Sequence, residues 1–229
     1  MTLAVAIKAA DGVVVAADSR GTIGDPRGLT AVNDTQQKVS RFGRCALATA
    51  GAGELALSLL DEFAKRGLND PQDTDDALAA FRVGAGVTDE WFRTIPVEKR
   101  PEVVFLLAGY PRASASALPA AYLLTSSTYF APQLAGNYPM MIGVPQYAIY
   151  LSHRYYDPAM TADNAAALAA YLISETASQD PKVGGPIRMA KVTQSGYVEL
   201  TVEDVNRLMV RNEGLNAHLK RFFLNGDNP

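Results

Sequence analysis

Thr2 is the residue of this sequence whose type and position could do chemistry on its own. A threonine hydroxyl is a weak nucleophile and needs a base within hydrogen-bond reach. If Met1 is removed, Thr2 carries that base itself, because its free α-amine titrates near about 8. Small second residues generally permit removal of the initiator methionine. From position alone, however, Thr2 is more simply interpreted as a tolerated second residue at the start of a strand.

Other side chains with catalytic or ligand-binding potential are few. The chain has one cysteine, Cys45, so an intramolecular disulfide and a cysteine zinc cluster are both excluded. His153 and His218 are interpreted as solvated or hydrogen-bonded histidines, and Cys45 as a small core residue. The acidic residues of 73–76 lack the glycine and distal glutamate of a calcium loop, and there is no glycine-rich phosphate loop. The sequence therefore predicts no metal and no other cofactor.

The bulk composition is that of a globular protein. Of the 229 residues, 48% are hydrophobic and 20% are charged, which is enough apolar material for a core. The net charge of -3 gives no reason to expect a nucleic-acid partner. We see neither a signal peptide nor a run of about 18 apolar residues, so we expect no membrane segment and a cytoplasmic location. One domain is expected over 1–229, with a frayed polar tail at 224–229.

Thr2 must be positioned by the elements around it, and the apolar pattern predicts these. Residues 2–8 and 13–19 are predicted to be buried strands joined by a turn at Asp11-Gly12. Hairpins are expected at 38–51 and 184–201, and residues 20–36 are expected to form a loop with short strand pieces. Further strands are predicted at 102–110, 120–126 and 138–144. Helices are predicted at 52–67, 73–92, 161–178 and 201–223, the third with Thr161 as its N-cap. Because strands and helices come in blocks, the order indicates antiparallel sheets covered by helices.

Several short stretches, taken in order, resemble the catalytic β-subunits of the proteasome and their bacterial relatives, the N-terminal-nucleophile threonine peptidases. The matching pieces are Thr2, AADSRGT at 16–22, Lys38 in QQKV, TAGAGE at 49–54, and Asp180 followed by Gly184-Gly185. Taken singly, each piece has a simpler structural explanation, such as a strand cap or a turn. Their joint order favours the catalytic interpretation. The resemblance implies an α+β fold of the four-layer αββα sandwich type.

The resemblance also implies catalytic roles for five residues. Thr2 would be the nucleophile, with its own α-amine as the proton acceptor. Lys38 would lie beside the hydroxyl and favour its deprotonation, and Asp18 would pair with Lys38. Gly51 would donate its backbone N–H to the oxyanion of the tetrahedral intermediate, and Asp180 would orient the amine.

Four more residues would bind substrate if the resemblance holds. Thr22 and Gly53 would flank an extended substrate strand and pair with its backbone. Thr49 and Gln36 would line the pocket for the side chain that precedes the cleaved bond.

The sequence departs from the family pattern in three ways. Residues 24–29 look like an insertion between Arg20 and Lys38. Val144 and Val183 stand where the family carries hydroxyl groups that support the threonine amine. No propeptide is expected ahead of Thr2, so removal of Met1 alone would have to expose it.

The function implied by the resemblance is a threonine-type endopeptidase subunit of a self-compartmentalising assembly. We expect homo-oligomeric stacked rings, unfolded polypeptide or peptide substrates, and an ATPase unfoldase as a candidate partner. Two alternatives stay open. One is a catalytically silent ring subunit of the same fold, favoured if Met1 is retained, and the other is an N-terminal-nucleophile amidohydrolase that acts on a small amide.

Overall fold

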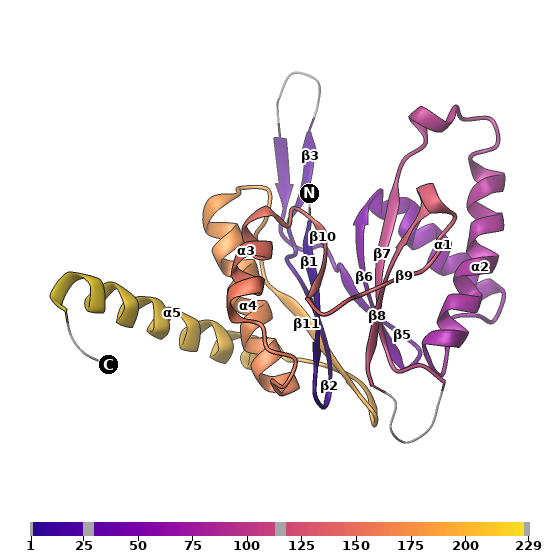
Figure 1. Cartoon of the computed structure of the whole chain (residues 1–229). Coiled ribbons are helices and arrows are strands. Elements are labelled where there is room, and N and C mark those ends of the chain that lie inside the picture. The colour runs from indigo at the N-terminus through magenta and orange to yellow at the C-terminus, as the bar shows by residue number, and fades with distance from the viewer. Residues whose placement is uncertain (1, 25–29, 113–117, 227–229) are drawn as a thin grey trace.

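The computed structural model describes residues 2–24, 30–112 and 118–226. Within these ranges the chain forms twelve strands, arranged in three antiparallel sheets, and five α-helices (Figure 1). None of these helices combines the length and apolarity that crossing a bilayer requires.

The first sheet contains the strand that begins directly after Thr2. Its five strands, in spatial order, are β10 (Met140–Gly143), β1 (Leu3–Ala9), β2 (Gly12–Ala17), β11 (Arg188–Thr193) and β12 (Gly196–Glu199). β1 and β2 are nearly continuous apolar runs, so both of their faces are buried. As a result, the start of β1 is held between two hydrogen-bonded neighbours.

The second sheet carries the residues that follow Lys38. Its strands, in spatial order, are β5 (Val39–Phe42), β6 (Cys45–Gly51), β7 (Val103–Gly109), β8 (Ala120–Thr125) and β9 (Gln133–Leu134). Apolar side chains from both five-stranded sheets form one shared core between them, which includes Val15, Ala48 and Leu106. The two sheets therefore face each other.

The helices cover the outer faces of these two sheets. α1 (Gly53–Lys65) and α2 (Thr74–Trp91) pack on the second sheet through a cluster of phenylalanines that includes Phe63, Phe81 and Phe105. The helices α3 (Gln146–Tyr155) and α4 (Ala162–Gln179) cover the first sheet. α4 presents a face rich in alanine to β1 and β2, which permits close approach. Short 3-10 turns occur at Val97–Lys99 and Ser126–Thr128.

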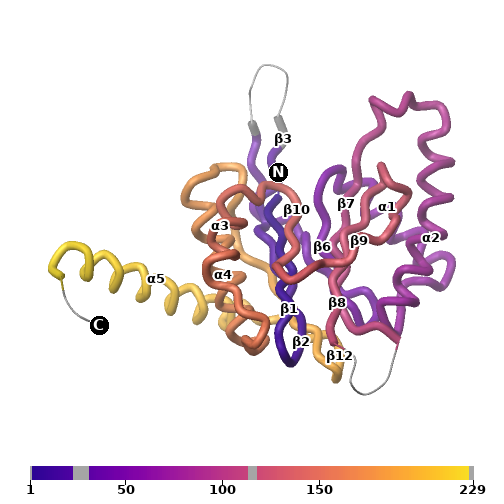
Figure 2. The backbone as a smooth tube through the Cα atoms, viewed as in Figure 1, coloured from indigo at the N-terminus to yellow at the C-terminus, as the bar shows by residue number. Residues whose placement is uncertain are grey.

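The last helix, α5 (Val202–Asn225), extends away from the body of the molecule (Figure 2). It begins with a capping box in which the Thr201 and Asp204 side chains each accept a hydrogen bond from the other residue's backbone N–H. α5 includes residues 224 and 225 of the segment expected to be a frayed tail, and residues 227–229 lie outside the described part of the chain, so fraying stays a prediction.

The four-layer αββα sandwich expected for the chain is wrong as a description of this fold. The structure has three antiparallel sheets, because β3 (Gly21–Gly24) and β4 (Thr30–Asn33) pair with each other in a sheet of their own. Figure 1 shows this ribbon projecting beyond the start of β1. The observed architecture is an α+β fold with three sheets and five helices in the described ranges.

The local predictions agree better with the structure. The four predicted helices are confirmed to within two residues at each end, and Thr161 caps α4 by accepting a hydrogen bond from Asn164. The expected loop over 20–36 contains β3 and β4, which the sequence suggested only as short strand pieces.

Candidate active site

A buried ion pair lies beside the start of β1. Lys38 Nζ donates to Asp18 Oδ1 at 2.8 Å, and their side chains are 5% and 0% exposed. Asp18 directly follows β2, and Lys38 directly precedes β5, so the pair joins the two large sheets. Burying two charges costs free energy unless their geometry is good and further hydrogen bonds satisfy them.

Backbone groups supply those further hydrogen bonds. Asp18 Oδ1 accepts from Leu3 N at 3.0 Å, and Oδ2 accepts from Arg20 N and from Gly184 N, both at 3.1 Å. Lys38 Nζ also donates to the carbonyl oxygen of Arg20 at 2.7 Å. The Asp18 carboxylate thus binds three chain segments that lie far apart in the sequence, through Leu3, Lys38 and Gly184.

The environment of Lys38 shifts the titration of its ammonium group. Burial lowers the pKa of Lys38 below its ordinary value of 10.5, because removal from water disfavours the charged form. The hydrogen bond and the charge of Asp18, and then the charge of Asp34, act in the opposite direction but do not cancel the effect of burial. Lys38 is therefore an ammonium group that gives up its proton more readily than an exposed lysine.

Thr2 is fixed next to this pair. The oxygen of Asp18 that accepts from Lys38 also accepts from Leu3 N, one residue after Thr2. On the other side, the carbonyl oxygen of Thr2 accepts from Val144 N at 2.8 Å, and Thr2 is only 8% exposed. A Cβ at Gly143, whose φ is +93°, would lie 1.7 Å from the same carbonyl oxygen, so this close approach requires glycine.

Gly51 and Thr49 lie on the strand next to Lys38. Thr49 N donates to the carbonyl oxygen of Lys38 at 3.0 Å, and Gly51 ends the same strand, β6. Gly51 is exposed with a φ of +83°, and a Cβ there would lie 2.3 Å from the carbonyl oxygen of Glu102. The structure therefore places Gly51 at a turn that needs glycine, and its oxyanion role stays a prediction.

Asp180 lies at the start of the loop whose Gly184 contacts Asp18. It is the C-cap of α4, and its carboxylate accepts from Lys182 N at 2.9 Å. Val183 N donates to the Asp180 carbonyl oxygen at 3.1 Å, and the loop continues to Gly184, which binds Asp18. The hydrogen bond described for the Asp180 carboxylate thus stabilises its own loop, and its predicted contact with the Thr2 amine stays a prediction.

The three remaining substrate-binding candidates are more exposed. Thr22 lies on β3 opposite Val32, and Gly53 is the exposed first residue of α1. Gln36 is exposed, with its side-chain amide so close to Gly21 that a Cβ there would lie 2.3 Å from Gln36 Nε2. These roles stay predictions.

Two of the departures from the family pattern can be located in the structure, at least in part. Val144 and Val183 are both buried in the core between the first sheet and its helices, where a hydrophobic side chain packs well. Most of the suggested insertion at 24–29 lies outside the described residues.

Two features near Thr2 received no role in the sequence analysis. Arg20 forms a two-point ion pair with Asp34, fourteen residues further along the chain. The Ser19 hydroxyl is buried and has no hydrogen-bond partner within the described part of the chain. A buried hydroxyl without a partner is uncommon, and it lies next to Asp18 in the sequence.

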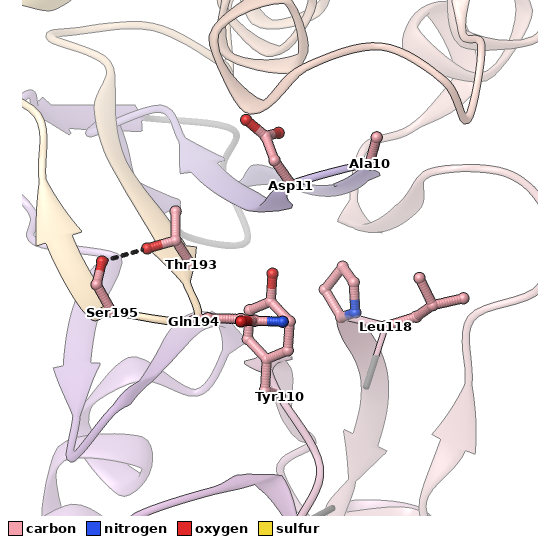
Figure 3. A pocket seen from close by; sticks show the side chains of 8 residues that line it. Ala10, Asp11, Tyr110, Leu118, Thr193, Gln194 and Ser195 are labelled. Carbon is pink, nitrogen blue, oxygen red and sulfur yellow. Dashed lines mark hydrogen bonds between the residues drawn. The ribbon is translucent and has the colours of Figure 1, made fainter. Parts of the chain in front are cut away.

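The larger of two described cavities lies at the other end of the first sheet. About 450 Å³ in volume, it is an open pocket lined by residues of two hairpin turns and of the segments before β8 and after β7 (Figure 3). Its polar lining includes Asp11, Tyr110, Gln194 and the hydrogen-bonded pair Thr193 and Ser195. The second cavity, of about 330 Å³, lies between α1 and the end of α2. Neither cavity is lined by a predicted site residue.

Comparison with known proteins supports the fold and goes no further. No family model matches the chain, and no curated protein matches it. Among solved structures, Anbu (ancestral beta-subunit) from Yersinia bercovieri is similar, with a TM-score of 0.77 and 16% identity over 99% of this chain and 98% of that one. An Anbu (Gly-1) mutant from Hyphomicrobium sp. strain MC1 has a TM-score of 0.71 and 19% identity over 100% and 99% of the two chains.

These findings correct the family identification made from the sequence. The motifs pointed to threonine peptidases, but neither the family models nor the curated proteins support that identification. The similar solved structures are ancestral beta-subunits, and at 16% and 19% identity they show a common fold only.

Proposed function

We propose that this chain hydrolyses peptide bonds of unfolded polypeptides through Thr2, after removal of Met1, as a subunit of a homo-oligomeric ring. The observation that supports this most strongly is the buried Lys38–Asp18 pair, which is hydrogen-bonded to the residue that follows Thr2. Such a pair is costly to bury and weak evidence for stability alone, so a catalytic role accounts for it better.

In the proposed reaction, the Thr2 α-amine accepts the proton of the Thr2 hydroxyl as Oγ1 attacks the carbonyl carbon of the scissile peptide. The Lys38 ammonium stabilises the negative charge that develops on the hydroxyl oxygen, and Gly51 N–H stabilises the oxyanion. The α-amine then donates its proton to the leaving nitrogen, and the C–N bond breaks to leave an ester on Thr2. Water attacks this ester and releases the second product, which restores the hydroxyl.

The ring proposal is supported by the fold. The similar structures are described as ancestral beta-subunits, a term for one chain of a larger assembly. In addition, α5 projects from the body and carries exposed apolar side chains, among them Leu215 in its middle and Phe223 and Leu224 near its end. Sedimentation velocity tests this part of the proposal: a ring gives one large species, and a monomer at micromolar concentration contradicts it.

The activity itself is tested with fluorogenic peptides and a denatured protein as substrates. We expect hydrolysis of both by the wild-type chain and none by Thr2→Ala. Hydrolysis of small amides without hydrolysis of peptides would contradict the substrate class. Full peptidase activity in Thr2→Ala would contradict the assignment of Thr2 as the nucleophile.

A further inference from the structure

A second ion pair lies directly outside the buried one. Arg20 Nε and Nη2 donate to the two carboxylate oxygens of Asp34, each at 2.8 Å. This two-point geometry fixes both side chains more strongly than a single contact would. Their side chains are 25% and 38% exposed, so the pair lies at the border between the site and solvent.

The Arg20–Asp34 pair packs against the loop that contains Gly184 and Gly185. Arg20 Nη1 donates to the carbonyl oxygen of Pro181 at 2.9 Å. A Cβ at Gly184 would lie 2.7 Å from Arg20 Cζ, and a Cβ at Gly185, whose φ is +73°, would lie 2.9 Å from Asp34 Cβ. The two glycines therefore allow the loop to pass directly beneath the ion pair.

The same loop holds Asp18 in place. Gly184 N donates to Asp18 Oδ2 at 3.1 Å, and the Gly184 carbonyl oxygen accepts from Ser19 N at 3.0 Å. A continuous series of contacts thus runs from Asp34 through Arg20 and Gly184 to Asp18, which binds Lys38.

The charges of the two pairs also act on each other. The negative charge of Asp34 raises the pKa of Lys38 and so partly offsets burial, and Lys38 in turn contributes to the lowered pKa of Asp34. Within residues 2–24, 30–112 and 118–226, carboxylates that act on Lys38 include Asp18 from the end of β2 and Asp34 from the segment after β4, and both carboxylates also interact with Arg20. Asp34 thus helps to keep Lys38 cationic.

We propose that Arg20 and Asp34 are positioning residues, which fix the Gly184 loop on Asp18 and so hold the Lys38–Asp18 pair beside Thr2. Their effect on hydrolysis rests on the function proposed above, whereas their effect on Lys38 can be measured without any substrate.

The test compares Asp34→Asn with the wild-type chain by two readouts. The first is the pH titration of the Lys38 side chain, followed by carbon-13 NMR of lysine-labelled protein and assigned with Lys38→Arg. The second is kcat/KM for a fluorogenic peptide. We expect the Lys38 titration to move to lower pH in Asp34→Asn and kcat/KM to fall about tenfold or more, as small displacements of catalytic groups do. Asp34→Glu should restore much of both, because it keeps the charge.

Two matched controls separate this role from general damage. Asp163→Asn removes an exposed carboxylate that pairs with Lys191 far from Thr2, and it should change neither readout. Gly185→Ala should reproduce the effects of Asp34→Asn. Gly67→Ala introduces the same kind of backbone strain, at a φ of +69°, with no atom within 4 Å of the new Cβ, and should leave both readouts unchanged.

The outcomes distinguish this inference from the proposed function. If the wild-type chain hydrolyses no peptide, the proposed function fails, and the Lys38 titration still decides the role of Asp34. If Lys38 titrates identically in the wild-type chain, Asp34→Asn and Gly185→Ala, all folded by circular dichroism, the positioning role is overturned.

Discussion

The two ends of β1 differ in how they use polar groups. At the Thr2 end, Lys38 and Asp18 are almost completely buried, and four hydrogen bonds satisfy the Asp18 carboxylate. At the other end, about 23 Å away along seven residues of extended strand, Asp11 is exposed. Its carboxylate accepts one described hydrogen bond, from Ala162 N at 2.7 Å, and lines the larger of the two cavities.

Under the proposed function, the chemistry lies at the Thr2 end and away from the larger cavity, so cavity size is a poor guide to it. The large cavity is lined by side chains that water can satisfy, so their presence there costs little. The Thr2 end instead holds charges out of water, which requires compensation and is difficult to explain by stability alone. The account therefore predicts that substitutions at the Thr2 end have large effects and that matched substitutions at the other end have small ones.

The largest difference is expected between two threonines. Thr2→Ala should lower kcat for peptide hydrolysis by at least about 10³-fold, because it removes the nucleophile. Thr193→Ala, which removes a hydroxyl bound to Ser195 at the other end, should leave kcat unchanged. Steady-state assays of both variants with one peptide check this, and equal losses in the two would refute the contrast.

Two aspartates provide the next comparison. Asp18→Asn should destabilise the fold by about 3–5 kcal/mol, because Lys38 is left buried without its counter-charge and an amide NH₂ faces backbone donors. Asp11→Asn should cost less than about 0.5 kcal/mol, since the exposed side chain keeps an oxygen for Ala162 N. Urea unfolding measures the free energy of unfolding of both variants. Similar losses would mean that the buried Lys38–Asp18 pair matters no more for stability than the exposed Asp11.

Two glycines on the segment that leads into α3 sharpen the comparison further. Gly143→Ala should reduce kcat/KM about 100-fold, because its Cβ would force β10 away from the Thr2 carbonyl oxygen. Gly136→Ala places its Cβ in open space and should have no effect on hydrolysis. Crystal structures of both variants would show whether the Thr2 backbone moves only in the first.

The pH dependence of hydrolysis should be a smaller but diagnostic effect. The rate should rise as the Thr2 α-amine loses its proton near about 8, and fall again as Lys38 loses its own. Because burial lowers the pKa of Lys38, this fall should begin below the ordinary lysine value of 10.5. Tyr110→Phe, at the other end, should leave both limbs of the kcat/KM profile unchanged, and a shift of either limb would count against the assignment.

The sequence predicted what depends on local signals. The helices were found because their apolar spacing and caps, such as Thr161, are local properties. The third sheet was missed because β3 and β4 are four residues each and depend on pairing with each other rather than on a buried apolar face.

The candidate site was also predictable only in part. The order of Thr2, Asp18 and Lys38 along the chain suggested one site, and the structure places the last two in direct contact. The pairing of Arg20 with Asp34 was not predicted, because an arginine can pair with any carboxylate that the fold brings near it. In the structure, the pairing of β3 with β4 places Gly21 opposite Asn33 and so brings Arg20 beside Asp34.

The most direct test of the central claim is the intact mass of the chain after incubation with a peptide epoxyketone. This reagent forms a stable ring only with a hydroxyl and a free α-amine of the same N-terminal residue. The account predicts a chain that lacks Met1 and carries one added inhibitor, and no adduct on Thr2→Ala. An unmodified wild-type chain that retains Met1 would contradict it.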